Sequence, residues 1–154
     1  MKILLTGATG QVGREVQRRS KLLGLTVIPT SRETLDIGDK AQTTSIFEHE
    51  DFDLIILDPP AFAKSLKARH NAIQAYKRLN AEALRKIKPG GILFTFSCSQ
   101  VVDRRLFANT ITAAGLESKR NVRILHQLSQ PADHPINIFH PETEYLKGLV
   151  LFVE

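Results

Sequence analysis

The chain has a single cysteine, Cys98, and its surroundings are the most specific chemical feature of the sequence. It stands in Phe94-Thr-Phe-Ser-Cys-Ser99, directly after an apolar run with the composition of a buried strand. The thiolate is the nucleophilic form of cysteine, so a catalytic Cys98 requires a depressed pKa. A lone cysteine beside a strand is also an ordinary apolar filler, and the residue type by itself leaves both interpretations open.

A glycine-rich loop follows the apolar run 2–6 and gives the second candidate site. Gly7-Ala-Thr-Gly10-Gln-Val-Gly13 has the spacing G-x-x-G-x-x-G. Glycines at these places allow a tight turn and let the backbone approach a pyrophosphate at the N-terminus of the next helix. The loop therefore predicts a nucleotide-cofactor site that includes Thr9, Gln11 and Val12. A tight strand-to-helix turn without a ligand is the alternative.

The N-terminal stretch resembles extended short-chain dehydrogenases, especially dTDP-4-dehydrorhamnose reductases, and Ser31-Arg-Glu-Thr-Leu-Asp-Ile37 continues this resemblance. The resemblance implies that Ser31 and Arg32 lie beside the adenosine ribose, with Asp36 and Ile37 beside the adenine. No acidic residue ends the second apolar run, and Arg32 is a cation that suits the extra phosphate of NADP. NADP or NAD is therefore a candidate cofactor; a solvated Arg32 is the alternative.

Reductase chemistry is not expected. The reductases use a Tyr-x-x-x-Lys pair, in which the lysine lowers the pKa of the tyrosine so that it can donate a proton. The only tyrosines are Tyr76 and Tyr145, and the residues four positions later are Asn80 and Leu149. A nucleotide-sugar reductase is disfavoured for this reason.

From Asp53 onward the sequence resembles bacterial large-subunit rRNA cytosine-5 methyltransferases, which use S-adenosylmethionine. The segments that carry this resemblance are 52–60, 90–99, 132–135 and 145–148. This resemblance implies that Cys98 attacks C6 of cytosine. It also implies that the rigid loop Asp58-Pro-Pro-Ala-Phe62 orients the Asp58 carboxylate toward the base. Asp58 and Pro59 are further expected to contact the cofactor. For Asp133 and His134, a role in ordering their loop is favoured over a metal site or proton relay.

Two features of those methyltransferases differ in this sequence. The reductase-like loop and the missing acid replace the groups that grip S-adenosylmethionine, so its affinity is expected to be weakened. The N-terminal RNA-binding module is also absent, so RNA binding is not expected. The segment 64–78 contains five basic residues: Lys64, Lys67, Arg69, Lys77 and Arg78. They form either a basic rim near the site or a helix face that is simply solvated.

The composition of the chain limits the classes of protein to which it can belong. At 154 residues, with 42% hydrophobic and 24% charged, the chain is long enough to bury a core. The net charge of +5 fits either an RNA-facing surface or simple solubility. One cysteine excludes an internal disulfide and a Cys-rich zinc site, so we expect no metal and a cytoplasmic location. No apolar run approaches the roughly 20 residues that cross a bilayer, so no membrane partner is expected.

Alternation of strand-like and helix-like segments predicts an α/β, three-layer doubly wound Rossmann-like sheet. The order 3-2-1-4-5-7-6, with the last strand antiparallel, is expected from the methyltransferase resemblance. Val12, Val16 and Leu23 are predicted to face the core, and Tyr76 likewise. Predicted strands are 2–6, 25–28, 35–37, 54–57, 92–96, 121–128 and 145–153, and predicted helices are 11–23, 40–48, 71–86 and 103–114. Predicted helix ends are set by Gly24 and Gly115, and Asp103 is a predicted cap.

The predicted organisation is a single domain, 1–154, with a reductase-like half (1–50) and a methyltransferase-like half (51–154). An abrupt change of resemblance within one domain favours an engineered chimera: a folded scaffold with residual NAD(P) or S-adenosylmethionine binding and no efficient catalysis. The alternative is a working rRNA cytosine-5 methyltransferase with Cys98 as nucleophile. Imperfect packing between the halves makes either a monomer or a fragment-swapped dimer the expected state.

Overall fold

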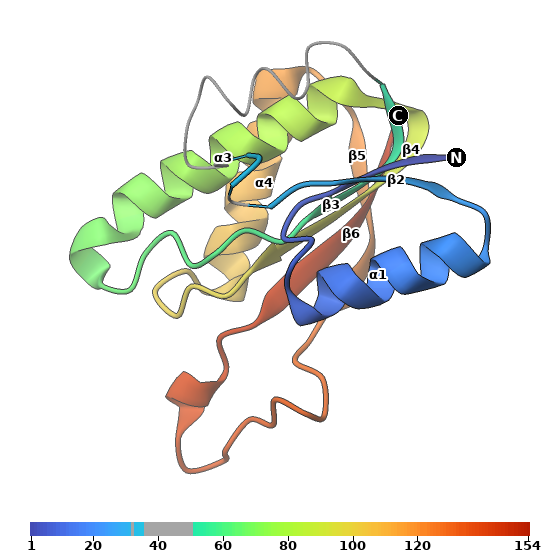
Figure 1. Ribbon diagram of the computed structural model, residues 1–154. Coiled ribbons are helices and arrows are strands. Elements are labelled where there is room, and N and C mark those ends of the chain that lie inside the picture. The colour runs from blue at the N-terminus through green and yellow to red at the C-terminus, as the bar shows by residue number, and fades with distance from the viewer. Residues whose placement is uncertain (32, 36–50) are drawn as a thin grey trace.

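Short apolar runs separated by amphipathic segments form a central sheet with helices on both faces (Figure 1). The computed structural model describes residues 1–31, 33–35 and 51–154. The strands are β1 (Lys2–Leu5), β2 (Thr26–Pro29), β3 (Phe52–Leu57), β4 (Ile87–Ser97), β5 (Val122–Leu128) and β6 (Lys147–Val153). The helices are α1 (Gln11–Leu22), α3 (Arg69–Lys86) and α4 (Arg104–Ser118), with 3-10 turns η1 (Leu66–Ala68) and η2 (Pro141–Thr143).

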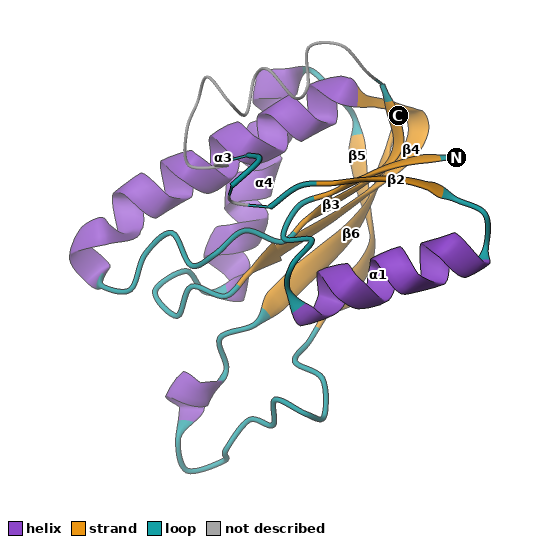
Figure 2. Ribbon diagram, viewed as in Figure 1, coloured by secondary structure: helices purple, strands orange, loops and turns teal. Residues whose placement is uncertain are grey.

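Within the described residues the sheet has six strands, in the order β2-β1-β3-β4-β6-β5 (Figure 2). Neighbouring strands from β2 to β4 pair in parallel, whereas β6 is antiparallel to both β4 and β5. For the described strands this confirms the predicted order and the antiparallel last strand. The predicted strand 35–37 reaches beyond the described residues, and the predicted helix 40–48 lies wholly outside them.

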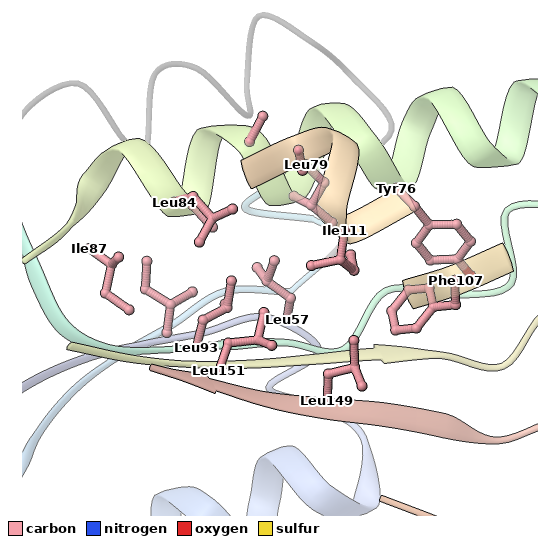
Figure 3. Close-up of a cluster of buried hydrophobic side chains, with 14 of the residues drawn as sticks. Leu57, Tyr76, Leu79, Leu84, Ile87, Leu93, Phe107, Ile111, Leu149 and Leu151 are labelled. Carbon is pink, nitrogen blue, oxygen red and sulfur yellow. The ribbon is translucent and has the colours of Figure 1, made fainter. Parts of the chain in front are cut away.

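The larger core lies between the sheet and the pair α3 and α4, where side chains from both layers interdigitate (Figure 3). Leu57, Leu93 and Leu151 extend from the strands toward Tyr76 and Leu84 of α3. All of these side chains are essentially fully buried, which removes apolar surface from water and stabilises this half of the molecule.

The smaller core lies under α1, and its helix face differs from the predicted one. Val12 is 52% exposed and Leu23 is 71% exposed, so these two predictions are wrong; Val16 is half-buried as expected. The buried residues of α1 are Gly13 and Ser20. At Gly13 the helix lies directly against the glycine-rich loop, where a Cβ would be 2.4 Å from the Gly7 carbonyl oxygen, so no larger side chain fits at that point.

Two predicted boundaries also differ. The predicted strand 92–96 is longer in the structure: β4 begins at Ile87 and contains a bulge, because Phe52 pairs with Ile87 whereas Leu54 pairs with Ile92. Gly115 does not end α4, which continues to Ser118 and is followed by Lys119 in the left-handed conformation, with φ 57°. The predicted cap is confirmed: the Asp103 carboxylate accepts a hydrogen bond from Leu106 N at 2.8 Å.

Candidate functional site

The three sequence motifs meet at one edge of the sheet because β1, β3 and β4 are parallel neighbours and each motif follows the end of its strand. Two adjoining clefts open there. The glycine cleft, about 670 Å³, is lined by the glycine-rich loop, by Thr30 and Ser31 after β2, and by 58–62. The cysteine cleft, about 460 Å³, is lined by 96–98, 146–148 and part of the loop between β5 and β6. Asp58 lines both clefts.

The glycine-rich loop is packed directly on the loop that carries Asp58. Gly7 has φ +68°, and a Cβ placed on it would lie 2.9 Å from the backbone oxygen of Asp58. The Asp58 N–H donates to the Thr6 hydroxyl at 2.8 Å, and that hydroxyl donates to the Ile56 carbonyl at 3.3 Å. The glycines are therefore required by the turn and by this contact, whether or not a ligand binds.

The structure divides the predicted cofactor residues between the clefts. The glycine cleft contains Gly7, Thr9, Gly10, Ser31, Asp58 and Pro59. Gln11 and Val12 line the cysteine cleft instead, and Gly13 is buried beneath the loop. Arg32, Asp36 and Ile37 lie outside the described residues. The end of β2 offers the hydroxyls of Thr30 and Ser31, of which Thr30 donates to the Leu5 carbonyl at 3.3 Å.

Cys98 directly follows β4 and is half-buried. The side chains of its two neighbours in the sequence, Ser97 and Ser99, both contact the hydroxyl of Tyr76. The Ser97 hydroxyl donates to Tyr76 Oη at 3.0 Å, and Tyr76 Oη lies 3.1 Å from Ser99 Oγ. The Tyr76 ring packs edge-on against Phe62 and Phe107, at centroid distances of 4.7 and 5.6 Å. This buried network fixes the backbone on both sides of the thiol and joins it to α3.

Replacement of Tyr76 by phenylalanine is expected to lower the free energy of unfolding by about 1–2 kcal/mol, because two buried serine hydroxyls each lose one hydrogen-bond partner. Urea unfolding measures this change. Tyr145→Phe is the matched control, since Tyr145 is less buried and the structure shows its backbone N–H, not its hydroxyl, in a hydrogen bond. Equal losses in the two variants would contradict the role assigned to the Tyr76 hydroxyl.

The electrostatic surroundings of Cys98 correct one expectation. Burial raises the pKa of the Cys98 thiol, and the nearby Asp58 carboxylate raises it further, whereas a backbone hydrogen bond at Cys98 and the charge of Lys147 lower it. The pKa of Cys98 is therefore raised, and the depressed pKa predicted for a catalytic thiol is wrong. Burial also raises the pKa of Asp58.

Lys147 is the residue of the cysteine cleft that sequence reasoning missed. Its side chain is 6% exposed, its Nζ donates to the Ser99 carbonyl at 2.8 Å, and burial lowers its pKa to about 8. A signal was present: this lysine begins an otherwise apolar strand, Lys147-Gly-Leu-Val-Leu-Phe-Val153. A charged residue in such a run is an unusual feature that points to a site.

Asp133 and His134 also line the cysteine cleft, with His134 Nδ1 3.3 Å from Asp133 Oδ2. Gln130 orders this loop: its Nε2 donates to the His134 carbonyl at 2.8 Å, and its Oε1 accepts from Tyr145 N. Within the described ranges, no cluster of three or more His, Cys, Asp or Glu side chains is suited to hold a metal ion. None of the helices in these ranges is long and apolar enough to cross a membrane.

Comparisons with known proteins support both resemblances. Ribosomal RNA large subunit methyltransferase I of Aeromonas salmonicida (strain A449) is 45% identical over 102 residues, which are 66% of this chain and 26% of that protein. The chain thus spans about a quarter of the length of this curated relative. A family model described as the RmlD substrate binding domain matches residues 1–90.

Solved structures support the fold. A candidate S-adenosylmethionine-dependent methyltransferase from Streptococcus mutans has a TM-score of 0.69 at 17% identity, covering 98% of this chain and 44% of that one. A dTDP-4-dehydrorhamnose reductase from Bacillus anthracis str. Ames, in complex with NADP, has a TM-score of 0.50 at 17% identity, covering 77% of this chain and 49% of that one. At these identities the likeness concerns the fold alone, and it confirms the predicted Rossmann-like α/β class.

These findings overturn one hypothesis and establish a family. The engineered scaffold without catalysis is wrong as the main interpretation, because relatives at 44–45% identity are named rRNA methyltransferases, which favours the stated alternative. The family model covers more than half of the sequence. The chain therefore belongs to the RmlD substrate binding domain family.

Proposed function

We propose that this chain carries the catalytic part of an S-adenosylmethionine-dependent RNA methyltransferase that acts on C5 of cytosine in large-subunit rRNA. The observation that supports it most is the shared wall of the two clefts: Asp58 lines the glycine cleft and also the cleft that contains Cys98. A cofactor in the first cleft and a base in the second would meet across this carboxyl group. The named relatives support the coarser part of this proposal, methyl transfer to large-subunit ribosomal RNA.

The glycine cleft fits a nucleotide-type cofactor. Gly7 and Gly10 present bare backbone to it, while Ser31 and Asp58 supply a hydroxyl and a carboxyl group for ribose or amino groups. We assign cofactor contacts to Gly7, Thr9, Gly10, Ser31, Asp58 and Pro59. When bound, S-adenosylmethionine supplies an electrophilic methyl group. NADP or NAD stays a candidate ligand of the same cleft, and a weakened affinity for S-adenosylmethionine stays a prediction.

The residues of the cysteine cleft have distinct tasks in this proposal. The Cys98 thiolate adds to C6 of cytosine, which places an electron pair on C5 and makes that carbon nucleophilic. After C5 has taken the methyl group, loss of the C5 proton to solvent and cleavage of the bond between Cys98 and C6 restore the base and the thiolate. An ionised Asp58 accepts a hydrogen bond from the exocyclic amine of cytosine, a donor group that distinguishes this base. The Tyr76 network keeps the sulfur in place during addition and release.

The test is methyl transfer itself. Labelled S-adenosylmethionine and large-subunit rRNA fragments are incubated with the chain, and the RNA is digested to nucleosides and analysed by mass spectrometry. We expect the label in 5-methylcytidine. A folded chain that transfers no label to any fragment, or labels another base, would contradict the proposal. A calorimetric titration with S-adenosylmethionine, NADP and NAD identifies the ligand of the glycine cleft.

Three organisational expectations stay predictions. We propose a single domain over 1–154, with halves 1–50 and 51–154, because β1 pairs with both β2 and β3 in one sheet. A monomer or fragment-swapped dimer, and a cytoplasmic location, are likewise proposed. Limited proteolysis and sedimentation test the first two.

A further inference from the structure

Lys147 contacts the residues on both sides of Cys98, one through its backbone and the other through its side chain. Its backbone pairs with Ser97, the residue before the cysteine, in the antiparallel ladder of β4 and β6. Its side chain then reaches the other side, where Nζ donates to the carbonyl of Ser99 at 2.8 Å. The lysine therefore contacts both chain neighbours of the thiol, and it lines the same cleft.

Burial of the Lys147 ammonium group costs free energy that a purely structural residue would not require. A buried ammonium group loses hydration, and the described residues give Nζ one hydrogen-bond acceptor for its three donors. The rest of β6 is apolar apart from Gly148, so an apolar side chain would suit the sheet at lower cost. A positive charge at this place needs a partner, and the Cys98 sulfur is the ionisable group whose charge favours it most.

We propose that Lys147 is a positioning residue that stabilises the thiolate of Cys98 and so prepares the nucleophile before the base binds. The use of that thiolate in methyl transfer rests on the proposed function. The electrostatic claim does not, since it concerns the protein without RNA or methyl donor.

Several charged or titratable groups surround the pair. Asp58, from the end of β3, opposes the thiolate, and Tyr76 of α3 interacts with Cys98 through charge. Asp103, Arg104 and Glu144 act on Lys147 from the start of α4 and from the loop before β6. Asp133 and His134 line the cleft from the loop after β5. Among these side chains, Lys147 is the one that lowers the pKa of Cys98, in addition to a backbone hydrogen bond at Cys98 itself.

The sole cysteine makes the test direct, because alkylation of the protein by iodoacetamide reports on Cys98 alone. The rate of this reaction follows the thiolate fraction, so its pH profile is measured for the intact chain, for Lys147→Met and for Lys147→Arg. Lys21→Met, an exposed lysine of α1, is the matched control. Thermal unfolding by circular dichroism shows which variants are folded.

We expect Lys147→Met to slow alkylation about tenfold at about pH 7, which corresponds to roughly one unit in the thiol pKa. The difference should fade as the pH passes about 8, where Lys147 itself loses its proton. Lys147→Arg should restore most of the rate, and Lys21→Met should leave it unchanged. A folded Lys147→Met with an unaltered profile, or one slowed equally at every pH, would overturn the proposal.

A second measurement needs no change at Lys147. In the intact chain, the logarithm of the alkylation rate should rise steeply with pH below about pH 8 and less steeply above it, because the thiolate loses its positive neighbour where Lys147 titrates. A single unbroken slope through this pH contradicts the proposal. Neither experiment uses RNA, so a failure here is separate from a failure of methyl transfer.

Discussion

Replacement of Cys98 by alanine is expected to lower methyl transfer to RNA by a factor on the order of a thousand or more, because addition of the thiolate to C6 is what makes C5 reactive. Cys98 is half-buried beside, not within, the main core, so the variant should fold. The measurement is labelled methyl transfer at saturating RNA, together with a urea unfolding curve. Thr112→Ala, on the exposed face of α4, is the control and should keep full activity.

Retention of activity in a folded Cys98→Ala variant would show that methyl transfer proceeds without covalent addition, and it would remove the central element of the proposed mechanism. Binding of S-adenosylmethionine should persist in this variant. Its predicted contacts lie in the glycine cleft, whereas Cys98 lines the other one.

The pH profile of the reaction carries its own expectation. The reactive form is the thiolate, and burial together with Asp58 raises the pKa of Cys98. The thiolate fraction at neutral pH is therefore small, and the rate should rise with pH through and beyond the ordinary range of a cysteine. Single-turnover rates across this range test the sign: a rate that is flat or falls with rising pH would contradict it.

Substitution of Gly13 by alanine is expected to lower the free energy of unfolding by roughly 2–4 kcal/mol, the second large effect that the structure indicates. A Cβ at this position would lie 2.4 Å from the Gly7 carbonyl oxygen and 2.7 Å from the Ala8 Cα. Both atoms belong to backbone that cannot turn aside, so α1 must move away from the loop. Urea or thermal unfolding measures the loss.

Gly115→Ala is the matched control, because it places the same methyl group in the interior of another helix. Its Cβ would meet Val122 Cγ2 at 3.6 Å and the Arg120 oxygen at 3.7 Å, which are ordinary contacts. Alanine favours the helix over glycine, so this variant should gain about 0.5–1 kcal/mol. Equal effects at the two glycines would show that close packing of α1 does not account for Gly13.

The sheet could be predicted because its strands are short, apolar and separated by clear helix signals. β3 ends at Leu57, as the predicted strand 54–57 does, and the ordering of the motifs along the chain brings Asp58 and Cys98 to one edge of the sheet. The glycine loop could be placed at that edge for the same reason.

What could not be predicted depends on distances between segments that are remote in sequence. The exposure of Val12 and the close approach of α1 to the glycine loop at Gly13 are features that no periodicity reveals. The raised pKa of Cys98 follows from burial and from Asp58, which stands forty residues earlier in the sequence. The importance of Lys147 depends on strand pairing between β4 and β6.

The outermost strand bears on how copies of the chain behave at high concentration. β5 ends the sheet, and Ile124 and Leu125 are about half exposed along it. An open strand of this kind invites another backbone to add to it. Its ladder with β6 is broken between Ile124 and His126, and Arg123 carries a charge beside the break. Such an interruption limits an incoming strand to a few consecutive hydrogen bonds, which protects the protein from edge-to-edge aggregation.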